Sequence, residues 1–351
     1  MNRYVQLTIF VALVAFSLLA ISCGSGSDEE VPSAPSALTP TAEEVPSAPF
    51  LPASAEEGTS SARAYVTNLL SATVSVLDLS TNTEIATIPV GQTPKGIAIT
   101  PDGIHAYVTN QLSSTVSVLD LNTNTEIATI SVGNGPRGIA ITPDGNHAYV
   151  TNQFSDNVSV LDLGTNTEIA TIPVGDGPKG IAITPDGTRA YVTNFSLSTI
   201  SVIDLSVDTE IATIPVGNDP WNIAITPDGT RAYVANQLSS TISVLDLSTD
   251  TGITTISLGD APWDIAITPD GDRAYVANFG SISVLDLSTD TERGTIPVED
   301  GPWNIAITPD GTRAYVTNRD DNTISILDLS TDTELATISV GDGPRGIAIT
   351  P

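Results

Sequence analysis

The sequence predicts an all-β fold, a seven-bladed β-propeller with four antiparallel strands per blade. A unit of about forty residues, seen cleanly over residues 148–187, occurs seven times. Each copy contains four short runs rich in Val, Ile, Thr and Tyr, bounded by turn residues, and none of these runs has a helical period. Four antiparallel strands in every forty residues are typical of a propeller blade. The tyrosine of the first run marks the copies: Tyr65, Tyr107, Tyr149, Tyr191, Tyr233, Tyr275 and Tyr315.

The four expected strands of one unit are AYVTN, NVSVLDL, EIATIPVG and GIAIT. The TPDG that follows the fourth strand suits a tight hairpin, because Pro fixes φ, Asp caps the turn and Gly accepts positive φ. The STNT or STDT between the second and third strands is a polar turn whose side chains can bond their own backbone. The aspartate of VLDL recurs in every copy, which favours a structural role at this turn over membership of one active site.

The ends of the repeat predict how the ring closes. The repeats start at an AYVTN strand and the chain stops after a GIAIT strand, so the strand from Gly346 to Thr350 can pair beside Tyr65. The C-terminal strand then completes the N-terminal blade, with the (G/N/D)IAIT strands innermost and the TI(P/S)VG strands outermost. Such closure removes exposed sheet edges and joins the chain ends without a covalent bond.

The motifs AYVTN, SVLDL, TNTEIATIPVG and GIAITPDG together resemble the YVTN-type β-propeller repeat family, across about residues 63–351. The resemblance implies an extracytoplasmic propeller. Its relatives include surface-layer proteins, bacterial surface or periplasmic binding proteins and, more distantly, lactonase-type and amine-dehydrogenase propellers. It does not imply one activity.

The N-terminus predicts export. Residues 1–22 combine a positive start with an apolar run and resemble a lipoprotein signal peptide that ends before Cys23, the only cysteine. An uncleaved signal anchor is the alternative. Residues 23–62 are a lipidated cysteine and a Pro/Glu/Ser-rich tether, with a docking motif in its repeated EEVPSAP as the alternative to a plain spacer. Residues 63–351 form the propeller. Because Gly24 follows the cysteine, we expect a lipid anchor in a bacterial outer membrane or at the cell surface.

The net charge of −29 excludes two classes of partner. Nucleic acids need a positive face, and an anionic membrane surface repels an acidic protein, so the lipid anchor is the only membrane contact expected. We expect no cofactor and no metal site. Calcium in the acidic loops is a weaker alternative, because those loops lack a spaced ligand set. The loop acids are Asp176, Asp260, Asp300 and Asp342.

The residue directly before each AYV motif is either arginine or histidine. His105 and His147 are the only histidines and could suggest a metal pair on neighbouring blades. Arginine, which is neither a neutral ligand nor a base, fills the same slot in the other five blades. We therefore expect a structural slot in which the base pairs with the acidic PDG turn. The arginines are Arg63, Arg189, Arg231, Arg273 and Arg313.

The most informative position follows the loop proline, two residues before the IAI of each innermost strand. Around the predicted ring it forms a basic arc of four residues and an aromatic arc of three at the mouth of the central channel. A ligand-binding site there would stack a ring on tryptophan and hold an anion on Lys and Arg. Late duplication of tryptophan blades, with tryptophan only covering strand ends, is the alternative. The residues are Lys95, Arg137, Lys179, Trp221, Trp263, Trp303 and Arg345.

The sequence holds no HExxH, GxSxG, phosphate-binding loop or cysteine nucleophile, so no catalytic residue is assigned and we expect a non-catalytic protein. The function predicted is an exported binding module that takes an anionic glycan, cell-wall fragment or protein ligand at the channel mouth. One alternative is a propeller enzyme of the lactonase or dehydrogenase-associated type, and another is a structural surface-layer component.

Overall fold

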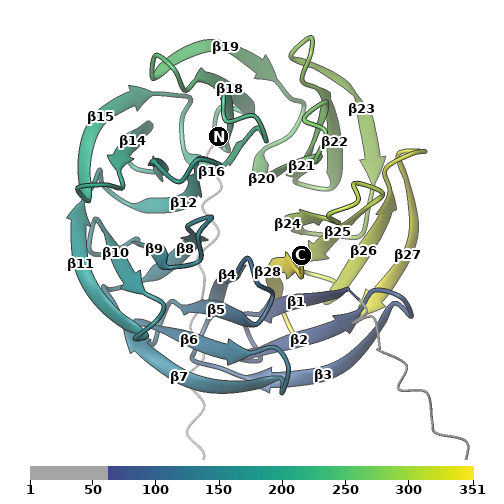
Figure 1. The fold of residues 1–351 in the computed structure, drawn as a ribbon. Coiled ribbons are helices and arrows are strands. Elements are labelled where there is room, and N and C mark those ends of the chain that lie inside the picture. The colour runs from purple at the N-terminus through teal and green to yellow at the C-terminus, as the bar shows by residue number, and fades with distance from the viewer. Residues whose placement is uncertain (1–61) are drawn as a thin grey trace, which may run out of the picture. The chain divides into compact units, whose positions relative to one another are not determined.

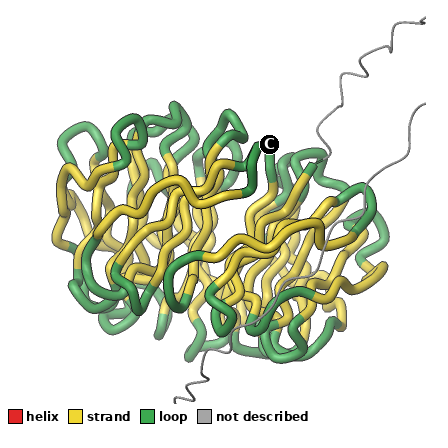
Figure 2. The backbone as a smooth tube through the Cα atoms, turned by 90° about the horizontal axis from the view of Figure 1, so that it is seen from below, coloured by secondary structure: helices red, strands yellow, loops and turns green. Residues whose placement is uncertain are grey.

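The computed structural model describes residues 62–351, which form seven four-stranded antiparallel sheets arranged around a central channel (Figure 1). The seven-bladed propeller predicted from the sequence is confirmed, including the order of the four strands in each blade. Every regular element in the described part is a strand, and none of it is a helix that could cross a membrane. Seen from the side, the loops gather at the two ends of the strands (Figure 2).

In each blade the four strands lie side by side, in order from the channel to the outer rim. The innermost strands are β4 (Pro94–Ile99), β8 (Pro136–Ile141), β12 (Pro178–Ile183), β16 (Pro220–Ile225), β20 (Pro262–Ile267), β24 (Pro302–Ile307) and β28 (Pro344–Ile349). The second strands are β1 (Arg63–Asn68), β5 (His105–Asn110), β9 (His147–Asn152), β13 (Arg189–Asn194), β17 (Arg231–Asn236), β21 (Arg273–Asn278) and β25 (Arg313–Asn318). The third strands are β2 (Thr73–Asp78), β6 (Thr115–Asp120), β10 (Asn157–Asp162), β14 (Thr199–Asp204), β18 (Thr241–Asp246), β22 (Ser281–Asp286) and β26 (Thr323–Asp328). The outermost strands are β3 (Thr83–Pro89), β7 (Thr125–Ser131), β11 (Thr167–Pro173), β15 (Thr209–Pro215), β19 (Thr251–Ser257), β23 (Thr291–Pro297) and β27 (Thr333–Ser339).

Blade 1 is the sheet β28-β1-β2-β3, and blades 2 to 7 follow in chain order from β4 to β27. The predicted ring closure is confirmed, since β28 pairs antiparallel with β1. Tyr65 lies opposite Ala348, and at the end of the pair the Thr350 amide donates to the Arg63 carbonyl at 2.9 Å. Both chain ends of the ring therefore belong to one sheet.

Apolar packing between neighbouring blades follows from the two middle strands, which are almost fully buried. In one such cluster Tyr65 and Val76 of blade 1 pack against Ala106 and Val108 of blade 2. Strand alternation sends side chains to both faces of each sheet, and both faces meet another blade. This explains why the second strand, AYVTN, is apolar without alternation.

The buried tyrosine of each blade also bonds to the next blade. Its hydroxyl donates to an Asn or Asp in the turn between the third and outermost strands of the next blade. Tyr191 reaches Asp250 at 2.7 Å, and Tyr315 closes the circle on Asn82 at 3.4 Å. Burial raises the pKa of Tyr191 to about 12, so the phenol stays a donor at neutral pH.

The arginine slot before AYV pairs with a different carboxylate from the one expected. Arg189 Nη1 lies 2.9 Å from Asp250, in the neighbouring blade's turn, and Arg231 and Arg273 repeat this pattern one and two blades further on. The PDG aspartates are already occupied; Asp186, for example, accepts hydrogen bonds from its own turn. The slot therefore serves the contact between blades.

The turns themselves follow the sequence. Gly103 of the first PDG turn has φ of 69°, and its amide donates to the Thr100 carbonyl at 2.8 Å. The VLDL aspartates accept from backbone amides two and three residues on, as Asp120 does from Asn122 and Thr123. At the opposite ends of the strands, the loop after each second strand lies beside the loop before the innermost strand of the same blade. In blade 1, for example, the Leu69 amide donates to the Gly343 carbonyl. We call this second face, where the innermost strands begin, the mouth face.

Candidate functional site

The innermost strands bring six of the seven predicted mouth residues to one pocket at the mouth face. Each residue follows the proline that begins its strand, and the seven strands surround the channel (Figure 1). The cavity measures about 210 Å³ and is partly open to solvent. We call it the mouth pocket. Its predicted lining residues are Lys95, Arg137, Lys179, Trp221, Trp303 and Arg345.

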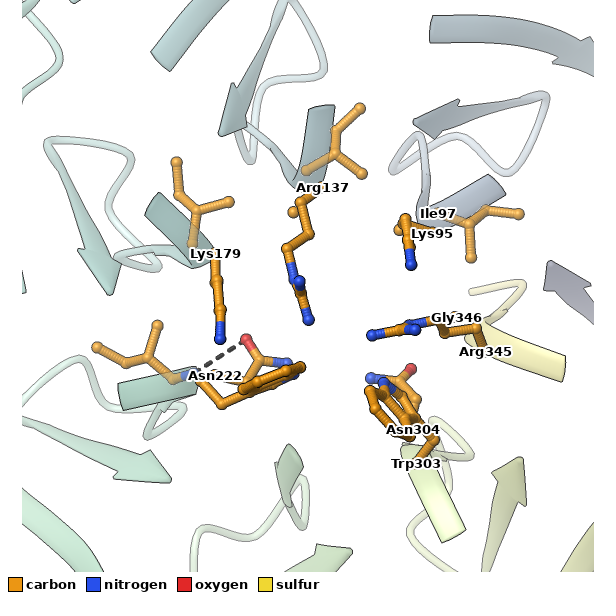
Figure 3. Close-up of a pocket in the computed structure, with 16 residues that line it drawn as sticks. Lys95, Ile97, Arg137, Lys179, Asn222, Trp303, Asn304, Arg345 and Gly346 are labelled. Carbon is orange, nitrogen blue, oxygen red and sulfur yellow. Dashed lines mark hydrogen bonds between the residues drawn. The ribbon is translucent and has the colours of Figure 1, made fainter. Parts of the chain in front are cut away.

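The four residues of the basic arc lie together in space. Lys95, Arg137, Lys179 and Arg345 come from the adjacent strands β4, β8, β12 and β28, and their side chains point toward the centre of the pocket (Figure 3). Within residues 62–351 none of these four bases belongs to an ion pair, although the chain has 41 acidic residues. Buried charges are normally paired, so this cluster is suited to an anion supplied from outside.

The two lysines, the only ones in the sequence, have strongly lowered pKa values. Burial, and then the positive charges of Arg345 and Arg137, lower the pKa of Lys95 to about 6. Burial and Arg137 lower the pKa of Lys179 to about 5, although Asp219 opposes this shift. At pH 7 both amines are therefore mostly neutral and can accept a proton.

The two arginines remain cationic under the same conditions. Burial lowers the pKa of Arg137 to about 9, which still lies well above neutral pH. Arg345 is 9% exposed, and burial and Arg137 lower its pKa as well. Guanidinium groups keep their proton in proteins, so the pocket combines two fixed cations with two neutral amines.

The tryptophans of the aromatic arc pack on one another. Trp263 stacks on Trp303 with ring centroids 4.4 Å apart and meets Trp221 edge to face at 4.6 Å. Trp221 and Trp303 line the mouth pocket, whereas Trp263 does not. Trp263 therefore supports the other two rings, and the prediction that all three contact a ligand is still to be tested.

Cationic groups lie over the faces of the lining tryptophans. Arg345 lies 3.9 Å from the Trp303 ring centre, and Arg137 lies 4.2 Å from that of Trp221. The Lys179 amine contacts Trp221 and Phe195 as well. Because Lys179 is mostly neutral at pH 7, its contact is mainly packing, while the two arginines make true cation–π contacts.

Three residues of the site come from the loops after the second strands and were not singled out from the sequence. Phe195 meets Trp221 edge to face, Gln153 accepts a hydrogen bond from Arg137 at 3.2 Å, and Arg319 lies over Trp303. The signal that could have found them is their position, the residue directly after the (T/A)N of each second strand. The residue type at this position varies between blades, and the position lies close to the proline that precedes the basic or aromatic residue of the same blade.

Two asparagines also line the pocket, and an aspartate outside the lining accepts hydrogen bonds from both. Asn222 and Asn304 line the mouth pocket, and both donate to Asp264, which is 4% exposed. Burial raises the pKa of Asp264 to about 6, although hydrogen bonds from Ile305 and the two amides oppose the shift. The sequence shows these residues only as companions of the tryptophans.

Residues 62–351 contain no cluster of three or more His, Cys, Asp or Glu side chains that could hold a metal ion. His105 and His147 begin β5 and β9, and neither lines the mouth pocket. The lipidation predicted at Cys23 lies outside the described residues.

The fold and the pocket define a propeller with a basic channel mouth, and the family can now be stated. The model of the seven-bladed β-propeller lactonase family matches residues 56–171, 128–257 and 165–300, which together span residues 56–300. The chain belongs to this family. No sequence among the curated proteins matches it.

Solved structures share the fold at low sequence identity. Hydrazine synthase of Kuenenia stuttgartiensis is 25% identical, with a TM-score of 0.69 over 72% of this chain and 88% of that one. A functionally unknown protein of Desulfotomaculum acetoxidans is 20% identical, with a TM-score of 0.75 over 82% and 98%. A putative 6-phosphogluconolactonase of Bacteroides fragilis is 18% identical, with a TM-score of 0.72 over 84% and 99%.

The expectation of a non-catalytic protein is therefore wrong. It depended on the absence of linear catalytic motifs, but the matching family is named for an enzyme activity. Motif searches fail here for a physical reason. In a propeller the site is assembled from one or two residues per blade, so its members lie about 42 residues apart and form no local signature.

Proposed function

We propose that the protein is a lactonase-type hydrolase that opens a small lactone carrying an anionic group, with the mouth pocket as its active site. The observation that carries this proposal is the cluster of four bases that line the pocket without a carboxylate partner. Family membership supports the reaction class. We also propose that the repeats are of the YVTN type within this propeller family.

Lactone hydrolysis requires three functions of an active site. A water oxygen adds to the ring carbonyl carbon while a base takes the water's proton, and the carbonyl oxygen becomes an oxyanion. The bond from that carbon to the ring oxygen then breaks, and the leaving oxygen takes up a proton, so that the product is a hydroxy acid. The site must supply a base, stabilise the oxyanion and hold the rest of the substrate.

Lys95 is the proposed base. Its amine is mostly neutral at pH 7, points into the pocket (Figure 3), and makes no hydrogen bond or ring contact with the rest of residues 62–351. Lys179 is less suitable, because its amine covers the rings of Phe195 and Trp221. After the ring opens, protonated Lys95 can return the proton to the leaving oxygen. A lysine made basic at neutral pH by burial and neighbouring cations is well suited to this work.

Arg345 and Arg137 are the proposed anion ligands. Both stay cationic, both reach the pocket, and each lies on a tryptophan face that fixes its guanidinium plane. A guanidinium binds phosphate or carboxylate through two parallel hydrogen bonds, which also orients the substrate. The rest of the protein is strongly negative and repels anions, so the local positive charge of this pocket is what would attract one.

The test is lactone hydrolysis followed by proton release at constant pH. Two substrates of the same ring size are compared, neutral glucono-δ-lactone and its 6-phosphate. We expect acceleration over the buffer rate for the phosphorylated lactone, with a lower KM than for the neutral one. No acceleration of either lactone by folded protein would overturn the proposal, and equal KM values would remove the anion-binding part.

We further propose that the enzyme is exported and held at a bacterial membrane by a lipid on Cys23. The support is the apolar run and the single cysteine of the N-terminal sequence. Lipid labelling of cells that express the wild type and Cys23→Ser tests this proposal. Label and membrane association should both be lost in the variant, and retention of both would contradict the anchor.

A further inference from the structure

Three polar side chains replace glycine at one position in the aromatic half of the channel. Asn222 on β16, Asp264 on β20 and Asn304 on β24 follow the three tryptophans, whereas the four basic residues are each followed by glycine. Asp264 lies outside the pocket lining, between the two asparagines that belong to it. The general acid–base scheme above uses none of the three.

The hydrogen bonds fix which way both amides face. Asn222 Oδ1 accepts from the Ile223 amide at 3.0 Å, and Asn304 Oδ1 accepts from the Ile347 amide at 3.1 Å. The two Nδ2 groups donate to different oxygens of Asp264. Each carbonyl oxygen thus has a backbone donor and each amide nitrogen has a carboxylate acceptor, so reversing either amide would set donor against donor.

This arrangement leaves one N–H of each amide without an acceptor. An NH₂ group has two hydrogens and one is donated to Asp264, while neither Nδ2 makes a second hydrogen bond among residues 62–351. Both asparagines line the cavity on its aromatic side, opposite Lys95 and Arg137 (Figure 3). Two oriented donors at a site of ester hydrolysis are what an oxyanion requires.

We propose that Asn222 and Asn304 donate to the oxyanion of the opening lactone and that Asp264 is the positioning residue that aims them. The inference deepens the proposed function and rests on it. Asp264 is suited to the role because an ionised carboxylate only accepts hydrogen bonds, and at pH 7 it is mostly ionised. It acts through the asparagines and does not touch the substrate.

Steady-state kinetics of four variants test the roles separately. Asn222→Ala and Asn304→Ala should each lower kcat about 10²-fold, with KM changed by less than about threefold, because the donors act on charge that forms only in the transition state. Asp264→Asn should lower kcat similarly, since its new NH₂ group opposes one asparagine. Asp228→Asn, the same change in an exposed turn at the opposite face, is the matched control and should leave kcat unchanged.

Side-chain amide NMR signals give a second readout that needs no turnover. The signals of Asn222 and Asn304, assigned from the two alanine variants, should both shift in Asp264→Asn and remain in place in Asp228→Asn. Unmoved signals, or a full wild-type kcat in Asp264→Asn, would overturn the positioning role. If Asp264→Asn does not fold, unchanged kcat in both asparagine variants overturns the donors.

Failure of this inference can be told apart from failure of the proposed function. A wild type that hydrolyses no lactone removes the proposed function, yet the NMR comparison still decides whether Asp264 orients the amides. An active enzyme with unchanged asparagine variants keeps the proposed function and removes the oxyanion donors.

Discussion

The basic half of the channel, blades 1 to 4, and the aromatic half, blades 5 to 7, are held together by different bonds. In the basic half the Gly96 amide donates to Thr109 Oγ1 at 2.8 Å, and this hydroxyl donates to the Arg137 carbonyl of the next blade at 2.7 Å. A Cβ at Gly96 would lie 2.4 Å from that carbonyl oxygen. Close backbone contact between blades therefore requires glycine there.

In the aromatic half side chains take over this task. In blades 5 and 6 the threonine becomes Ala235 on β17 and Ala277 on β21, whereas blade 7 keeps Thr317, which still donates to the Arg345 carbonyl at 2.9 Å. In all three blades the glycine becomes Asn or Asp. Asp264 now accepts from the Ile305 amide of the next blade, and Asn304 from the Ile347 amide. The difference teaches that one half of the ring keeps its charged side chains unpaired on a backbone scaffold, while the other uses its polar side chains as the scaffold.

The largest effect should come from the basic half, where Lys95→Met should lower kcat more than any other change. If Lys95 is the base, kcat should fall by about 10²–10⁴-fold, the usual contribution of a positioned base. Lys179→Met, the matched change at the only other lysine, should cost much less. Single-turnover and steady-state rates measure both, and a larger loss in Lys179→Met would exchange the two roles.

The same half should gain stability when its buried amine is removed. Lys179→Met should raise the free energy of unfolding at pH 7 by roughly 1–4 kcal/mol, because folding the wild type must bury this amine and remove a proton that the unfolded chain keeps at this pH. The folded pKa of Lys179, about 5, lies below its unfolded value, so the wild type gains stability as pH rises from about 5 toward the unfolded pKa. The advantage of the variant should therefore shrink between pH 7 and pH 10. Denaturant unfolding at both pH values checks this, and a constant difference would show that Lys179 is already charged in the folded protein.

Arg345→Gln should separate binding from chemistry within the basic half. Loss of a charge-assisted hydrogen bond should raise KM for a phosphorylated lactone about 10–100-fold and leave KM for the neutral lactone nearly unchanged. Removing this cation should also raise the pKa of Lys95, so the acid limb of the rate profile should move to higher pH. Arg313→Gln, at a slot outside the mouth pocket, is the control, and the same KM change there would show a nonspecific charge effect.

The smallest effect should come from the aromatic half, where Trp263→Ala should lower the free energy of unfolding. Its ring contacts Trp221 and Trp303, and two aromatic pairs are worth roughly 1–3 kcal/mol together. The loss should appear in thermal or denaturant unfolding, with KM for the lactone changed less than by Trp303→Ala. A KM rise equal to that of Trp303→Ala would place Trp263 in contact with the ligand after all.

Much of this architecture could be predicted from the sequence because it repeats. Seven tyrosines at a regular spacing fix the number of blades, and the repeat ends predict that β28 joins β1. The position after the loop proline could be predicted as a ring around the channel for the same reason. A single break in symmetry, Lys and Arg against Trp, marked these residues as a candidate site, and six of the seven line one pocket.

The rest depends on distances between blades, which a repeat pattern does not contain. The pairing of Arg189 with Asp250, 61 residues away, could not be distinguished from a bond to its own turn. Asp264 could not be recognised as a shared acceptor, because its partners Asn222 and Asn304 lie on two other strands. The lowered pKa values of the lysines arise from burial and from cations on neighbouring blades, which only the closed ring assembles.

The pairing of β28 with β1 has a mechanical consequence. The two strands are antiparallel, and Arg63 and Thr350 lie side by side at one end of the pair. Tension between these two residues would load the hydrogen bonds one after another, as in a zipper, instead of all together. A pull on the ring would therefore peel β28 out of blade 1 at low force and carry Arg345 away from the other bases, while the remaining six sheets stay folded. The anion site would come apart before the fold does.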